Sequence, residues 1–180
     1  MIIIGEKING SIPSVAEAIA NRDAEFIKDR ARKQAEANAT FIDCCASVPE
    51  EQDDSGIPKN AADRLRVFDK IMAKAKEYGI SPSRIHIDPL VEMLCTSENG
   101  IETNIEVIST VREKYPSIHI TAVISNISFN LPVRKLINLG FVVLAMNAGL
   151  DSGILDPTNR DMLGLIYAAS AAQVAKSLAA

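Results

Sequence analysis

Hydrophobic and polar positions along the chain follow two different periods. Short apolar runs, some of them alternating with polar residues, are typical of β-strands and occur at residues 1–6, 40–46, 84–90, 118–124 and 152–156. Between these runs, apolar residues return every three or four positions. This spacing predicts helices that begin near residues 14 and 24, helices over about 61–78, 101–114 and 133–148, and a last helix from about 158. The regular alternation of strand and helix predicts an α/β fold with a parallel sheet or barrel.

Local signals mark the ends of several helices. Ser14 and Glu17 match a capping box, in which two side chains satisfy backbone N–H groups at a helix start. Asp23 is placed to cap the second helix, and Gly149 is placed to end the helix over 133–148. In the helix over 61–78 we expect a buried apolar stripe, formed by Leu65, Phe68, Ile71, Met72 and Ala75.

The composition narrows the class of protein. With 180 residues, 47% of them hydrophobic and 23% charged, the chain has enough apolar material for a single domain over residues 1–180. A net charge of −4 provides no basic surface for nucleic acid. No apolar run approaches the roughly 20 residues of a membrane span, and the start lacks the charged region of a signal peptide, so we expect a cytoplasmic protein.

Metal-ligand residues are sparse. Cys44, Cys45 and Cys95 show no Cys-x-x-Cys spacing, and the chain has only two histidines. This set indicates no metal site.

Polar residues recur where predicted strands end. Asp43, Asp88, Asn126 and Asp156 each follow an apolar run. Any single one is explained most simply as a turn former, but the carboxyl ends of parallel strands share one edge, so four together favour a common mouth. The richest stretch follows residues 118–124, where we expect Asn126 to lie in a loop.

Four motifs carry a resemblance to a known family. They are Gly5-Glu-Lys-Ile-Asn-Gly10, Ile87-Asp-Pro-Leu90, Ser125-Asn-Ile-Ser-Phe129 and the stretch 145–157. Together they resemble the pterin-binding barrel family of methyltetrahydrofolate:corrinoid methyltransferases, which includes the folate domain of cobalamin-dependent methionine synthase. Dihydropteroate synthases share that fold, but their first motif is of a different kind.

The resemblance implies a TIM (β/α)8 barrel, which needs more chain than is present. The fold takes about 250 residues and eight strands, whereas the sequence predicts five strands. Matching the motifs leaves about three strands, or roughly 60 residues, missing between Gln52 and Asp53. Either a segment has been closed up in this sequence, or the chain carries a true internal deletion.

The resemblance also implies an activity. It is methyl transfer between N5 of methyltetrahydrofolate and the cobalt of a corrinoid held by a partner protein, without a metal of the enzyme's own. Asn126 would be the catalytic residue, through a hydrogen bond to N5, and Asp88 would accept from the pterin edge. The resemblance further implies a substrate-binding set, which comprises Ser125, Phe129, Arg134, Asp43 and Asp156. We also expect a homodimer.

Two other functions stay open at this point. A folate- or partner-binding protein without turnover is possible because the missing strands would remove ligand contacts. Lys7 in the first loop would suit a Schiff-base aldolase on the same kind of barrel, although one lysine is weak evidence for that chemistry.

Overall fold

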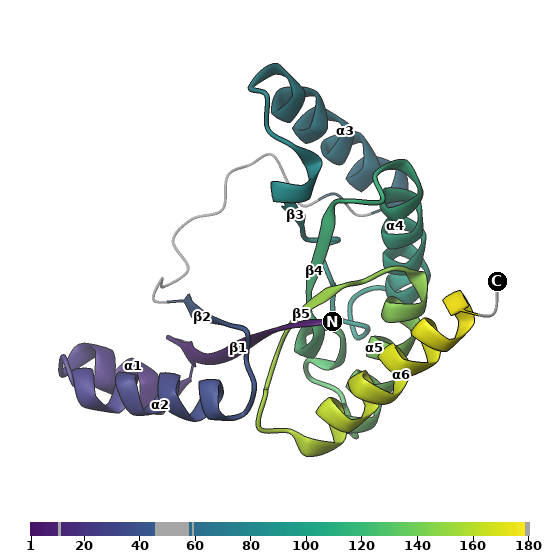
Figure 1. The fold of residues 1–180 in the computed structure, drawn as a ribbon. Helices are drawn as coiled ribbons and strands as arrows, with labels where there is room; N and C mark the ends of the chain where they lie inside the picture. Colours follow the sequence, from purple (N-terminus) through teal and green to yellow (C-terminus); the bar gives the residue numbers. More distant parts are fainter. Residues whose placement is uncertain (11, 46–57, 59, 179–180) are drawn as a thin grey trace.

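The computed structural model describes residues 1–10, 12–45, 58 and 60–178. Within these residues, five strands form one sheet in the order β2-β1-β5-β4-β3 (Figure 1). The strands are β1 (Ile2–Asn9), β2 (Phe41–Cys45), β3 (His86–Ile87), β4 (His119–Val123) and β5 (Ser152–Leu155). Every adjacent pair is parallel, so the predicted parallel α/β fold is confirmed.

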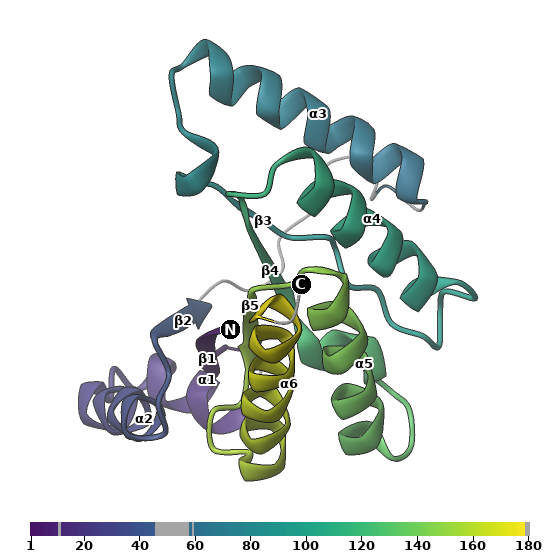
Figure 2. The same cartoon turned by 45° about the vertical axis from the view of Figure 1, so that its right-hand side comes forward.

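Helices provide the crossovers that parallel strands require. They are α1 (Pro13–Ala20), α2 (Ala24–Glu36), α3 (Ala61–Glu77), α4 (Gly100–Lys114), α5 (Arg134–Ala148) and α6 (Arg160–Leu178). Helix α3 contacts α4, α4 contacts α5, and α5 contacts α6, and these four helices follow one another around the sheet (Figures 1 and 2). None of the helices described combines the length and the apolarity needed to cross a membrane.

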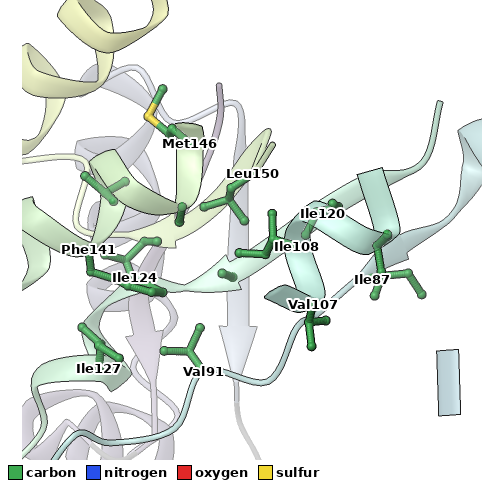
Figure 3. Packing of buried hydrophobic residues seen from close by; sticks show 14 of the residues in the cluster. Ile87, Val91, Val107, Ile108, Ile120, Ile124, Ile127, Phe141, Met146 and Leu150 are labelled. Atoms are coloured by element: carbon green, nitrogen blue, oxygen red, sulfur yellow. The ribbon is translucent and has the colours of Figure 1, made fainter. Parts of the chain in front are cut away.

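The core lies between β4 and the helices that cover it (Figure 3). Ile120, Ala122 and Ile124 alternate along the strand and its continuation, and each is at most 1% exposed. They belong to one apolar cluster with Ile108 of α4 and Phe141 of α5. A buried isoleucine side chain contributes about 1.5–3 kcal/mol, so this layer strongly favours a single register for β4.

The helix starts agree only in part with their sequence signals. Asp23 caps α2 as predicted, because its side chain accepts a hydrogen bond from the Phe26 N–H. The capping box of Ser14 and Glu17 was a wrong prediction: α1 begins at Pro13, and its N-cap, Ile12, makes no side-chain capping bond. Proline is pre-organised for the first helical position. The helix therefore begins at Pro13, so that Ser14 lies inside the helix and not at its N-cap.

The buried face of helix α3 agrees with the expected apolar stripe at four of its five residues. Phe68, Met72 and Ala75 are buried as predicted, and Leu65 packs against the core while partly buried. The prediction for Ile71 was wrong, since it is 44% exposed. Arg64 occupies the buried face instead and is 5% exposed, because its polar groups find acceptors in the loop after β3.

The chain after β3 and the chain after β4 both differ from the prediction. The strand expected over 84–90 retains only His86 and Ile87, because Pro89 has no N–H for a ladder and Leu90 has a φ of +65°. Asn126 lies not in an open loop but in a 3-10 helix, η2 (Ile124–Ser128), directly after β4. Both features turn the chain sharply at the carboxyl end of the sheet.

The sheet formed by the described residues is open. Strands β2 and β3 are its two edges, and they are not paired with each other. Phe41 on the β2 edge is 58% exposed. The described strands therefore do not close a barrel, and the predicted break between Gln52 and Asp53 lies outside the described residues.

Candidate functional site

The carboxyl ends of β1, β4 and β5 bring polar side chains into contact. The register that pairs Gly5 with Leu155 places the next residue of each strand, Glu6 and Asp156, at the same level. The Ser125 hydroxyl donates to Glu6 Oε2 at 3.2 Å. Lys7 Nζ lies 2.9 Å from Asp156 Oδ2. Three neighbouring strand ends are thus linked through side chains.

The two carboxyls of this group have opposite electrostatic environments. Burial raises the pKa of Glu6, and the nearby Asp156 charge adds to that effect, while Ser125, Lys7 and Arg134 oppose it. Burial alone would also raise the pKa of Asp156, but hydrogen bonds from Thr158 and Lys7 hold it below its usual value. Asp156 is therefore the carboxyl of the pair that ionises more readily, and Glu6 is the carboxyl that binds a proton more readily.

Arg134, at the start of α5, holds the η2 turn. Its Nε donates to Ser128 Oγ at 3.1 Å and its Nη2 donates to the Ser125 carbonyl at 3.1 Å. The guanidinium carbon lies 5.7 Å from the centre of the Phe129 ring. These contacts fix the short segment that carries Asn126, and the arginine itself remains exposed.

Asn126 opens onto a groove beside η2. The groove has a volume of about 560 Å³ and is lined by Leu90, Val91, Glu92, Met93, Thr96, Asn126 and Phe129. A volume of this size suits a small-molecule ligand. Asn126 is exposed, and its side chain makes no hydrogen bond with any other described residue. Its amide is therefore available to a ligand.

Asp88 lies at the end of β3. Its Oδ1 accepts the Leu90 N–H at 2.7 Å. Burial raises the pKa of the Asp88 carboxyl, although the Leu90 N–H and the charge of Arg64 counter part of that rise. Asp88 lines a second cavity, of about 240 Å³, between β3 and α3, and Leu90 borders both this cavity and the Asn126 groove. The short loop that follows Asp88 therefore borders both cavities.

Of the remaining predicted residues, Phe129 lines the groove and Asp43 does not. Ser125 and Phe129 flank Asn126 in the chain, and Phe129 is 49% exposed in the groove wall. Asp43 lies half-buried on the edge strand β2, and no described side chain links it to the other members. The convergence of Asp88, Asn126 and Asp156 on one ligand stays a prediction.

The sequence analysis did not identify two residues of the site region, Glu6 and Arg64. Glu6 was read only as part of a motif, although its position directly after a buried glycine on β1 was a signal. Arg64 lies four residues before Phe68 and eight before Met72, so the helical period itself placed a charge on the buried face. Among the described residues, no group of three or more His, Cys, Asp or Glu side chains is arranged to hold a metal ion.

Comparison with known proteins agrees with these features. A family model described as "Pterin binding enzyme" matches residues 14–156. A "Methylcorrinoid:tetrahydrofolate methyltransferase" of Eubacterium limosum is 34% identical over 245 aligned positions, which cover 95% of this chain and 90% of the relative. Methionine synthases of Mycobacterium tuberculosis and Mycobacterium leprae are 31% and 30% identical over 111 residues, 57% of this chain and 9% of theirs.

The length of the first alignment carries additional information. Its 245 positions exceed the 180 residues of this chain. The Eubacterium relative must therefore have residues without a counterpart here.

We predict opposite effects on stability for two isosteric substitutions. At pH 7, Asp88→Asn should increase the free energy of unfolding, because the raised pKa means that the partly desolvated carboxylate, although still accessible to solvent, costs stability as pH rises through it. Asp156→Asn should lower it by about 0.5–1 kcal/mol, because a carboxylate with a lowered pKa stabilises the fold above its usual pKa through Lys7. Urea unfolding measures both. A loss of stability in Asp88→Asn equal to that in Asp156→Asn would contradict the electrostatic assignment.

Proposed function

The chain belongs to the pterin-binding enzyme family, and we propose that it transfers a methyl group between N5 of methyltetrahydrofolate and the cobalt of a corrinoid on a partner protein. The observation that carries this proposal is the similarity to the Eubacterium methyltransferase, which extends over 95% of the chain. Because that relative is an enzyme by name and matches almost throughout, a binding protein without turnover is the less favoured function. The folate is the substrate and the corrinoid belongs to the partner.

The chemistry assigns the first role to Asn126. A tertiary amine anion is a very poor leaving group, so N5 must gain positive character as the methyl group leaves. A neutral amide can donate or accept a hydrogen bond, and a bond that strengthens in the transition state accelerates the reaction. Asn126 is exposed on an open groove of about 560 Å³, which leaves room for the folate and for approach of a second protein.

The roles of the other site residues follow from charge and position. The pterin edge presents two neighbouring N–H donors, and the desolvated carboxylate of Asp88 can accept from them. One oxygen of this carboxylate, Oδ1, already accepts a hydrogen bond from the Leu90 N–H, which orients the side chain. Arg134 is exposed and uses two of its five donors locally, so it can still receive the glutamate tail of the folate. Ser125, Phe129, Asp43 and Asp156 complete the proposed substrate-binding set.

The proposal includes a closed barrel in a longer chain. In a barrel every strand has two neighbours, and the order β2-β1-β5-β4-β3 follows such a circle with one opening, between β2 and β3. About three further β/α units at this opening would complete eight strands. The Eubacterium alignment, which is longer than this chain, supports extra residues in the relative. Exposed Phe41 on one edge and exposed Ile71 near the other are side chains that such units would cover. The proposal also retains a homodimer and a cytoplasmic location.

We predict that Asn126→Ala slows methyl transfer far more than it weakens folate binding, because the proposed bond strengthens only as N5 gains positive charge. Stopped-flow absorbance of the corrinoid, at saturating folate with a cognate corrinoid protein, measures the single-turnover rate. Asn147→Ala, which truncates an exposed asparagine on α5, is the matched control. A loss of affinity without a loss of single-turnover rate would refute the role.

For Asp88 we expect an effect on affinity. Asp88→Ala should weaken methyltetrahydrofolate binding by one to two decades in dissociation constant, as expected for a lost charge-assisted pair of about 1.5–3 kcal/mol. Asp88→Asn should weaken it less, because one acceptor survives. Titration calorimetry gives both values, with Asp69→Asn on the exposed side of α3 as the control. If both Asp88 variants bind like the wild type, Asp88 has a purely structural role.

The barrel proposal predicts the mass of the native protein. A chain of 180 residues has a mass of 19.4 kDa, whereas a chain with three more β/α units is substantially heavier. Intact-mass spectrometry of the protein purified from its source cells separates the two. A native mass of 19.4 kDa would show that the opening between β2 and β3 is not filled by the same chain.

A further inference from the structure

Arg64 is buried in the first turn of α3 and is directed at the loop after β3. Its Nη1 donates to the carbonyls of Pro89 at 3.0 Å and Leu90 at 2.7 Å, and its Nη2 donates to the Glu92 carboxylate. Its Nε donates to the Pro58 carbonyl at 3.1 Å. Three of the four acceptors thus lie in one short loop. No other residue type could supply this planar fork of donors.

The position is an expensive one for a charged side chain. Removing a guanidinium from water carries a large desolvation cost, and replacing such a buried ion pair by an apolar residue is often neutral or stabilising. The neighbours Phe68 and Met72 show that this face of α3 accepts apolar side chains. A requirement for stability alone therefore does not explain Arg64, whereas a requirement for a defined loop conformation does.

The loop that Arg64 holds is the one that connects the two halves of the candidate site. Asp88 precedes it, and Leu90 borders both the Asp88 cavity and the Asn126 groove. Leu90 has a φ of +65°, which is unfavourable for a branched residue, so the loop conformation must be imposed by its contacts. Arg64 binds the carbonyl of that strained residue, and the Leu90 N–H binds Asp88.

We propose that Arg64 is a positioning residue for the methyl-transfer reaction, which sets the loop of residues 88–92 so that Asp88 and the groove of Asn126 meet the same ligand. The inference rests on the proposed function, since it assumes that the ligand is the folate. In this role Arg64 acts through the loop and is not itself a catalytic residue.

The charge of Arg64 provides a second effect that a packing role would not. Burial raises the pKa of Asp88, and the Leu90 N–H and Arg64 both lower it; Arg64 is the charged side chain from the described elements that acts on this carboxyl. Binding that depends on the Asp88 carboxylate is lost as pH falls through that pKa. Without the guanidinium the pKa rises further, so the acidic limit of binding moves to higher pH.

The test compares Arg64→Met, Arg64→Lys and the control Arg66→Met, which changes an exposed arginine of the same helix. Hydrogen exchange reports the loop directly: in Arg64→Met the amides of residues 90–94 should exchange at least about tenfold faster, with those of α4 unchanged. Calorimetry across pH should show methyltetrahydrofolate binding weakened on the order of tenfold or more, as expected when a ligand-contacting group is misplaced. The acidic limit of binding should lie at higher pH in Arg64→Met. Arg64→Lys should keep the acidic limit near that of the wild type while the loop still loosens.

The possible outcomes distinguish a failure of the role given to Arg64 from a failure of the proposed function. Unchanged loop exchange and unchanged affinity in Arg64→Met would overturn the inference while wild-type binding upholds the proposed function. Exchange that rises equally in β4 and α4, with wild-type affinity in the folded fraction, would show a purely structural arginine. A wild-type protein that does not bind methyltetrahydrofolate would overturn the proposed function and with it the role given to Arg64.

Discussion

The apolar layer between β4 and helices α4 and α5 fixes the register of β4 and with it the position of the candidate site residues that follow this strand. Because side chains alternate across a strand, a slip of β4 by one residue would move Ile120 and Ala122 from the core to the opposite face. The same slip would carry Ser125 and Asn126 away from the ends of β1 and β5. The cost of exposing two or three buried side chains, at about 1.5–3 kcal/mol for each large one, exceeds any contact made at the strand end. The core therefore sets the geometry of the site, and the polar groups adapt to it.

Two arginines, Arg134 and Arg64, then hold the chain segments that follow β4 and β3. Arg134 binds the η2 turn that carries Asn126, and Arg64 binds the loop that follows Asp88. They differ in burial: Arg134 is exposed and can exchange its contacts with water, whereas Arg64 is enclosed and cannot. Loss of a buried donor set leaves carbonyls unsatisfied, so the conformation after β3 is the more rigidly specified of the two. This difference suits the roles proposed for the two residues, with Asp88 as a rigid contact to the pterin and Asn126 as an adaptable catalytic amide.

Much of the fold was predictable because its signals are local. The apolar runs of the five strands and the period of the helices depend on neighbouring residues only, and the cap at Asp23 is a contact over three positions. The errors arose where distant or competing effects decide. Pro13 overrode the capping box at Ser14, and on α3 the acceptors around Arg64 allow an arginine on the buried face, whereas Ile71 is 44% exposed. No local pattern contains the information that Pro89 and Leu90 would bind that arginine.

The sequence predicted the edge of the sheet at which the candidate site lies, but not the contacts between its side chains. Polar residues after apolar runs indicated one edge of a parallel sheet, and the structure places Ser125, Asn126 and Asp156 at the ends of adjacent strands. The link from Glu6 to Ser125 spans 119 positions in sequence, so periodicity could not reveal it. The sequence likewise predicted a polar Asp88 but not the raised pKa of its carboxyl or the cavity that it shares with residues of α3.

The open sheet separates the chemistry of the proposed reaction from part of its binding surface. Strands β3, β4, β5 and β1 are neighbours in the sheet, so the residues proposed to act on N5 and on the pterin edge lie on one uninterrupted arc. A ligand held from one side gains fewer contacts and loses the exclusion of water that strengthens each polar bond. The arc alone would therefore retain the arrangement for methyl transfer while binding the folate weakly. The proposed closure between β2 and β3 would add affinity, whereas the proposed reaction depends on the side chains that β4 and its neighbours position.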